Sequence, residues 1–188
     1  AFFRLHPLIE AAAEDFPAFR RRLGRLAADI ELPPDLRALA TEALAASVTR
    51  ILARRLADDG TSLIGETTVV LVNDQVWEAH LVEGVWVQKI GGTHHLFYAA
   101  NDFSNARYGV GVATADHPLG PYAKAAEPFI QSSADWVAPG HPSVTINAAG
   151  EPQMFLHAFP PGRAGYKAFR ALMTARLALR GGRLELAP

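Results

Sequence analysis

Apolar residues in the first part of the chain recur at spacings of three and four, which places them on one face of a helix. One such stripe covers residues 8–30 and a second covers residues 36–56. Asp15 is well placed to cap a helix, and Pro33-Pro34 requires a turn between the stripes. The pattern therefore predicts a helical hairpin over residues 1–58.

From residue 59 onward the pattern changes to short β-branched or apolar segments separated by turn signals. Gly91-Gly92 is typical of a two-residue β-hairpin turn. Segments that follow one another every 8–12 residues or so, without helices between them, indicate an antiparallel sheet, a sandwich or a propeller. The predicted strands are residues 67–72, 85–90, 94–99, 108–113, 143–146, 152–157 and 168–175.

Composition supports this division and excludes several classes of function. Gly24 is the only glycine before Gly60, and glycine is costly inside a helix. With 18 Lys and Arg against 19 Asp and Glu, the net charge is −1, which argues against binding to nucleic acid or to an anionic membrane surface. The chain has no cysteine and therefore no disulfide or thiolate site. No apolar run approaches the roughly 20 residues of a membrane-spanning helix. Composition leaves a cytoplasmic or a secreted location open.

Two residues stand out as candidates for chemistry. Glu83 lies between apolar residues at the mouth of a predicted strand, next to Gly84. Partial desolvation of a carboxylate favours its protonated form, which suits a general acid. A solvated residue at the rim of a strand is the alternative. His141 lies in the stiff turn Pro139-Gly140-His141-Pro142, where a site residue and a hydrogen-bonded structural histidine both remain open.

A series of motifs gives the second part a family resemblance. From about residue 59 to the C-terminus, the chain resembles the later blades of a glycoside hydrolase family 43 five-bladed propeller, of the arabinofuranosidase, xylosidase and arabinanase type. The resemblance implies an α+β fold, with an N-terminal helical hairpin followed by about three antiparallel blades of a partial β-propeller over residues 59–188. The motifs that carry it are Asp59-Gly60-Thr61-Ser62-Leu63-Ile64-Gly65, Trp77-Glu78, Val82-Glu83-Gly84, Leu96-Phe97-Tyr98-Ala99-Ala100-Asn101, Tyr108-Gly109-Val110-Gly111-Val112-Ala113, Pro118-Leu119-Gly120-Pro121-Tyr122, Gly140-His141-Pro142-Ser143 and Leu156-His157-Ala158.

The resemblance also implies roles for five residues. Members of this family are inverting hydrolases with three central carboxylates, and Glu83 matches the general acid. His141 matches a histidine that reaches a central ion or water, which would be a calcium ion contacted through water. Arg170 resembles an arginine that faces the centre. Trp86 and Phe103 are candidates for stacking on sugar rings, with packing between sheets as the favoured alternative for each. No other cofactor is implied, and the implied partner is a pentose-containing oligosaccharide.

The departures from the family pattern shape the functional hypothesis. Val85 replaces the usual proline after Glu-Gly, and Pro142 replaces the usual asparagine after Gly-His. The first two blades are absent, so no residue is assigned as the catalytic base or as the aspartate that tunes the acid. We therefore expect a hydrolase whose base comes from another chain, with a non-catalytic sugar-binding or assembly module as the alternatives. Exposed sheet edges further predict self-association, either through the helices or through an open edge.

Overall fold

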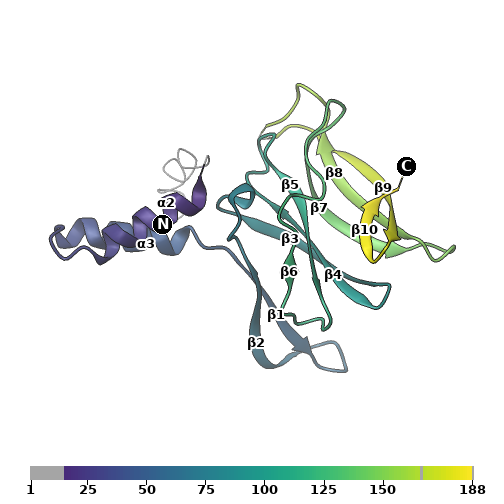
Figure 1. Ribbon diagram of the computed structural model, residues 1–188, viewed down its shortest axis with the longest axis horizontal. Helices are drawn as coiled ribbons and strands as arrows, with labels where there is room; N and C mark the ends of the chain where they lie inside the picture. The colour runs from purple at the N-terminus through teal and green to yellow at the C-terminus, as the bar shows by residue number, and fades with distance from the viewer. Residues whose placement is uncertain (1–14, 166, 188) are drawn as a thin grey trace.

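The computed structural model describes residues 15–165 and 167–187. Two antiparallel helices, α2 (Phe16–Ala28) and α3 (Pro34–Ala46), project to one side of three antiparallel sheets (Figure 1). The expected helical hairpin followed by a partial propeller is thus confirmed as an architecture. None of the helices in the described part of the chain has the length and apolar character needed to cross a membrane.

The helical hairpin is held together by its own small core. Asp15 caps α2, because its carboxylate accepts a hydrogen bond from the backbone N–H of Ala18 at 2.9 Å. Phe16 and Leu23 of α2 are buried in one apolar cluster with Ala43 of α3. The predicted cap and the apolar stripe are therefore confirmed from residue 15 onward, whereas the start of the stripe lies outside the described residues.

The predicted extent of the second helix is wrong. α3 ends at Ala46, and residues expected to continue it form strand β1 (Arg50–Leu56), which pairs with β2 (Leu63–Val72). The apolar residues of this short segment fit a helical period and an extended strand almost equally well. The partner strand decides between them, because β2 satisfies the backbone hydrogen bonds of β1 from Arg50 opposite Val72 to Leu56 opposite Leu63.

Two further sheets have four strands each. The second sheet has the order β3-β4-β5-β6 and the third has the order β10-β9-β8-β7, with every neighbouring pair antiparallel. The hairpin predicted at Gly91-Gly92 is confirmed, since Ile90 of β3 pairs with Thr93 of β4. The strands are β3 (Val82–Ile90), β4 (Thr93–Ala100), β5 (Gly109–Ala115), β6 (Ala123–Lys124), β7 (Val137–Ile146), β8 (Pro152–Phe159), β9 (Ala171–Arg180) and β10 (Arg183–Leu186).

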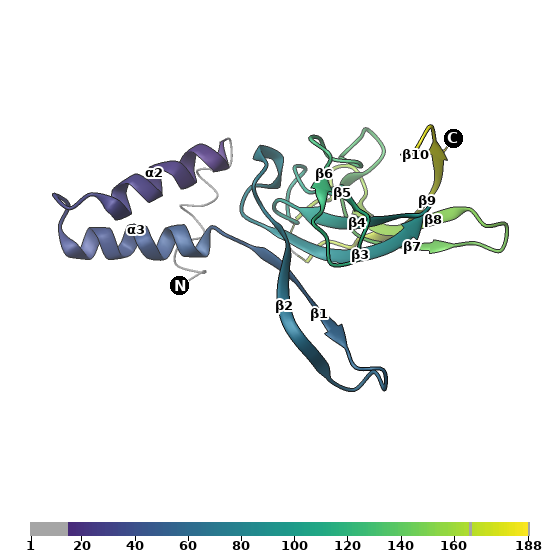
Figure 2. The ribbon, with the colours of Figure 1, turned by 60° about the horizontal axis from the view of Figure 1, so that its bottom comes forward.

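These two sheets pack face to face as neighbouring blades, with β3 against β7. Between them lies the main apolar core, which contains Ile90, Phe97, Val110, Val144, Met154, Leu156, Leu177 and Leu184. By contrast, β1 and β2 form a two-stranded sheet that extends away from the packed blades (Figure 2). In the described chain, β1 pairs only with β2, so its other edge has no strand beside it.

Candidate functional site

Glu83 lies near the start of β3, where the pairing with β4 is irregular. The register shifts between Glu83 and Trp86, and Gly84 takes the left-handed conformation with φ of 58°. A bulge of this kind redirects a side chain out of the sheet. Glu83 is half-buried, and its Oε1 accepts a hydrogen bond of 2.6 Å from the hydroxyl of Tyr108. The carboxylate is thus held by a tyrosine and not by the backbone of its own turn.

Two glycines allow this arrangement because larger residues would occupy the same space. A Cβ atom at Gly140 would lie 1.9 Å from Cε1 of Tyr108. A Cβ atom at Gly84 would lie 3.0 Å from Nδ1 of His141, whose own φ of 53° is also left-handed. The Gly-His turn of β7 therefore packs directly against the Glu-Gly turn of β3.

Two histidines and an arginine continue the site across the third sheet. The rings of His141 and His157 are stacked with their centroids 6.0 Å apart, and Nη1 of Arg170 lies 3.2 Å from Nε2 of His157. Because a guanidinium only donates, Nε2 is the acceptor and the proton of the neutral imidazole is on Nδ1. Burial lowers the pKa of His157, and the charge of Arg170 lowers it further. His157 therefore favours its neutral form.

Arg170 is fixed by four contacts in all. Besides His157, its Nη2 donates to the carbonyl oxygen of Phe103 at 3.2 Å, and its guanidinium lies 4.7 Å from the ring centroid of Phe159 and 5.3 Å from that of Phe103. Cation–π contacts of this kind stabilise a charge that is partly removed from water. Burial raises the pKa of Tyr108, and so does its hydrogen bond to Glu83, which keeps the phenol a proton donor to the carboxylate.

The structure brings together four of the five residues that the sequence singled out. Glu83, His141, Arg170 and Phe103 belong to one connected set of contacts. Trp86 does not join this set: it is paired with Phe97 and is 42% exposed. The sugar-binding roles assigned to these residues stay predictions.

Sequence reasoning missed Tyr108 and His157 as site residues. Tyr108 heads the Tyr-Gly-Val-Gly segment and His157 lies in the Leu-His-Ala segment. Both segments were interpreted as predicted strands and as motifs of the family, not as parts of a site. Their partners Glu83 and Arg170 are 25 and 13 residues away, so spacing along the chain gives no sign of either contact.

The same surroundings bear on the expected calcium ion. Among residues 15–165 and 167–187, no group of three or more His, Asp or Glu side chains is placed to hold a metal. Calcium takes six to eight oxygen ligands, whereas His141 has the imidazole of His157 beside it. These side chains do not fit direct calcium ligation, and contact through water stays a prediction.

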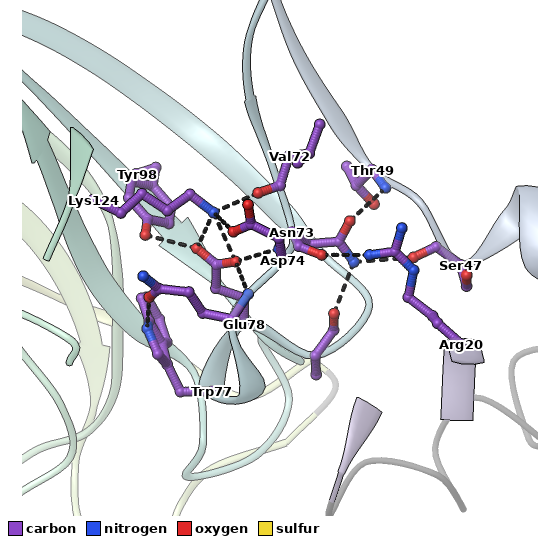
Figure 3. Close-up of polar contacts among 12 residues, drawn as sticks. Arg20, Ser47, Thr49, Val72, Asn73, Asp74, Trp77, Glu78, Tyr98 and Lys124 are labelled. Atoms are coloured by element: carbon purple, nitrogen blue, oxygen red, sulfur yellow. Dashed lines mark hydrogen bonds and ion pairs between the residues drawn. The ribbon is translucent and has the colours of Figure 1, made fainter. Parts of the chain in front are cut away.

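A second polar cluster is centred on Glu78 and Lys124, which are 46 residues apart in the sequence (Figure 3). The carboxylate of Glu78 is fully buried and lies 2.6 and 2.8 Å from Nζ of Lys124. It also accepts a hydrogen bond of 2.7 Å from the hydroxyl of Tyr98, whose pKa is raised by burial and by this carboxylate. Lys124 also donates to Asp74, at 2.7 Å, and to the carbonyl oxygen of Val72. An ammonium has three N–H donors, and these acceptors use all of them, so we interpret the cluster as a structural clamp.

Asn73 connects this clamp to the helical hairpin. Its side chain donates to the carbonyl oxygens of Ser47 and Ala79 and accepts from the backbone N–H of Thr49. The backbone carbonyl oxygen of Asn73 accepts a hydrogen bond of 2.7 Å from the guanidinium of Arg20 of α2 (Figure 3). One buried asparagine thus joins the helices and the β1–β2 hairpin to the turn at Ala79, which precedes β3.

The fold is similar to that of solved glycoside hydrolase structures. The chain aligns with a thermostable family-43 glycoside hydrolase with a TM-score of 0.68 and 27% identity, covering 75% of this chain and 48% of that one. It aligns with an endo-1,4-beta-xylanase from Bacteroides thetaiotaomicron with a TM-score of 0.66 and 26% identity, covering 74% of this chain and 50% of that one. The chain therefore spans about half the length of these structures.

Comparison with characterised sequences agrees. Over 84 residues the chain is 30% identical to beta-D-galactofuranosidase xynD from Aspergillus niger. The aligned region covers 43% of this chain and 25% of that protein. The family described as "Glycosyl hydrolases family 43" matches residues 39–182, which include every residue of the Glu83 site. The chain therefore belongs to glycosyl hydrolase family 43.

Proposed function

We propose that this chain supplies the general-acid half of an inverting glycoside hydrolase that acts on arabinose- or xylose-containing glycans. The observation that carries the proposal is the orientation of Glu83: the hydroxyl of Tyr108 donates to Oε1, so Oε1 is the carbonyl oxygen of the protonated acid and the acidic proton is on Oε2. In the described part of the chain no hydrogen bond reaches Oε2 of Glu83, which leaves this oxygen free to face a glycosidic oxygen. Arg170 uses its guanidinium to contact His157 and the carbonyl oxygen of Phe103, and its remaining N–H donors are available to hold a hydroxyl group of the sugar.

The proposed reaction needs a second carboxylate. In an inverting reaction, water attacks the anomeric carbon as the glycosidic C–O bond breaks. The proton of Glu83 passes to the leaving oxygen, and the proton of the water passes to a base roughly 6.5–9.5 Å from the acid. The polar side chains found around Glu83 are a tyrosine, two histidines and an arginine. We therefore assign the base to a carboxylate outside the described residues, on another chain or another segment.

The family and the names of two relatives support this substrate class. The endo-1,4-beta-xylanase named above acts on a xylose polymer, and the related beta-D-galactofuranosidase acts on a five-membered sugar ring like that of arabinofuranose. A panel of aryl xylosides, arabinofuranosides and galactofuranosides therefore covers the substrates that this site is expected to accept.

Azide provides the test, because it attacks the anomeric carbon without having to be deprotonated and so bypasses the missing base. With azide present, we expect the chain to convert both 4-nitrophenyl and phenyl glycosides into the inverted glycosyl azide. Glu83→Gln should slow the phenyl substrate by about 10²–10⁴-fold and leave the 4-nitrophenyl substrate nearly unchanged, because only the poor leaving group needs a proton. Equal slowing of both substrates, or no azide product at all, would show that Glu83 is not the acid.

The alternative is a sugar-binding module without chemistry, which the lack of a second carboxylate among the contacts of Glu83 favours. In that case xylotetraose should bind in a calorimeter, while no azide product forms from any aryl glycoside. The two functions therefore give opposite results in the same azide assay.

A further inference from the structure

A pocket of about 560 Å³ opens at the end of the second sheet where β3 begins and β4 ends. This volume lies within the roughly 300–1,000 Å³ that is typical of small-molecule sites. Trp77, Val76 and Pro128 give it an apolar wall, and Arg107 and Gln131 give it polar groups. It therefore has the mixed lining that such sites share.

The pocket and the Glu83 site share one loop, residues 101–108. The loop begins with Asn101, which lines the pocket, and ends with Tyr108, which donates its hydrogen bond to Glu83. Between these two residues, a backbone carbonyl of the loop accepts the hydrogen bond from Arg170. The two openings are therefore neighbours at the same end of the blade.

The aromatic wall of the pocket is already in place. Nε1 of Trp77 donates to Oε1 of Gln75 at 2.8 Å, and the indole stacks on the ring of Tyr98 with centroids 5.8 Å apart. The carbonyl oxygen of Trp77 accepts a hydrogen bond of 2.7 Å from the side chain of Asn101. A ring fixed in this way loses little conformational entropy when a ligand binds.

Two polar side chains of the pocket are free to bind a ligand. Arg107 and Gln131 are exposed, and in the part of the chain that the structure describes neither side chain makes a hydrogen bond or an ion pair. Ser132 differs, because its hydroxyl already donates to Ala106 and accepts from Ala138. An indole surface beside a free guanidinium and a free amide suits a ring with an apolar C–H face and hydroxyl groups at its edge.

We propose that this pocket is a second sugar-binding subsite, which holds a sugar unit of the same glycan whose scissile bond lies at Glu83. The identity of the glycan rests on the proposed function, whereas the pocket itself does not. Binding at both openings raises the affinity for long or branched glycans over that for short ones, because the second contact becomes intramolecular.

The test is an NMR titration of the ¹⁵N-labelled chain with xylohexaose, in which the indole N–H resonance of Trp77 reports on the pocket. We expect this resonance to shift on binding. The double variant Arg107→Ala/Gln131→Ala should bind roughly tenfold more weakly and lose most of the indole shift. Arg21→Ala, an exposed arginine on α2, is the matched control and should behave like the unaltered chain.

The proposal is overturned if the Trp77 resonance does not move at saturating xylohexaose, or if the double variant titrates like Arg21→Ala. Glu83→Gln separates this outcome from failure of the proposed function. An indole shift that survives Glu83→Gln and requires Arg107 and Gln131 supports the subsite, even if azide gives no product. Azide product without an indole shift leaves the general acid in place and removes the subsite.

Discussion

Lys124→Met tests the clamp between Glu78 and Lys124. The substitution keeps most of the side-chain volume and removes the charge that faces a carboxylate with 0% exposure. Tyr98 and the backbone N–H groups of Asp74 and Gln75 still donate to Glu78, but its negative charge is left uncompensated. Breaking a buried pair in this way costs about 3–5 kcal/mol.

In a chain of this size, each kcal/mol lowers the melting temperature by about 2–4 °C, so Tm should fall by about 6–20 °C. Urea denaturation followed by circular dichroism measures the same loss as a free energy of unfolding. Adding Glu78→Gln to Lys124→Met should recover part of the loss, because the buried charge is then gone as well.

Arg55→Met is the matched control. Arg55 and Asp58 also form an ion pair, at 3.5 Å, but their side chains are 70% and 97% exposed. Loss of such a pair costs about 1 kcal/mol at most. If Lys124→Met costs no more than Arg55→Met, or if Glu78→Gln makes the double variant worse, then the cluster is not the clamp inferred from its geometry.

Three further predictions follow from the packing and the titrating groups. Gly140→Ala should destabilise the chain by about 1–3 kcal/mol and change the near-ultraviolet circular dichroism of its aromatic residues, because the new methyl group overlaps the ring of Tyr108; unchanged spectra would refute the packing argument. Gly24→Ala, in α2 with no atom within 4 Å of the added Cβ, should instead stabilise the chain by about 0.5–1 kcal/mol in the same thermal denaturation. Burial lowers the pKa of both His95 and His157 below the ordinary value of 6.5, so protonation favours the unfolded chain. The free energy of unfolding should therefore be highest above about pH 6.5 and decrease as the pH falls below that value. Urea denaturation curves that do not change between pH 5 and pH 8 would contradict this.

Local patterns predicted the parts of the fold that local interactions determine. The cap at Asp15, the turn at Gly91-Gly92 and most strands depend on residues close together in the chain. Strand β1 was not predicted, because Ile51, Leu52 and Leu56 fit both a helical period and an extended strand. Only pairing with β2 selects the extended form. The two-residue strand β6 likewise has no period of its own to detect.

The candidate site divides in a similar way. Glu83 and His141 were predicted within their motifs, and Arg170 and Phe103 from the family resemblance. Tyr108 was not predicted, because its role depends on a contact across 25 residues and on the space left at Gly140. The Glu78–Lys124 pair was missed for the same reason, since its two charges come from segments 46 residues apart. The predicted self-association and the assignment of the base to another chain stay predictions.

The free edge of β1 has a consequence for colloidal behaviour. Its exposed leucines, Leu52 and Leu56, favour stacking of one chain on another, but the same strand carries Arg50, Arg54 and Arg55. When two such edges approach in an antiparallel sense, their like charges face each other and repel. This repulsion acts over about 10 Å at 0.1 M salt and about 3 Å at 1 M. Solutions of the chain should therefore remain clear at low ionic strength and turn cloudy as salt is added.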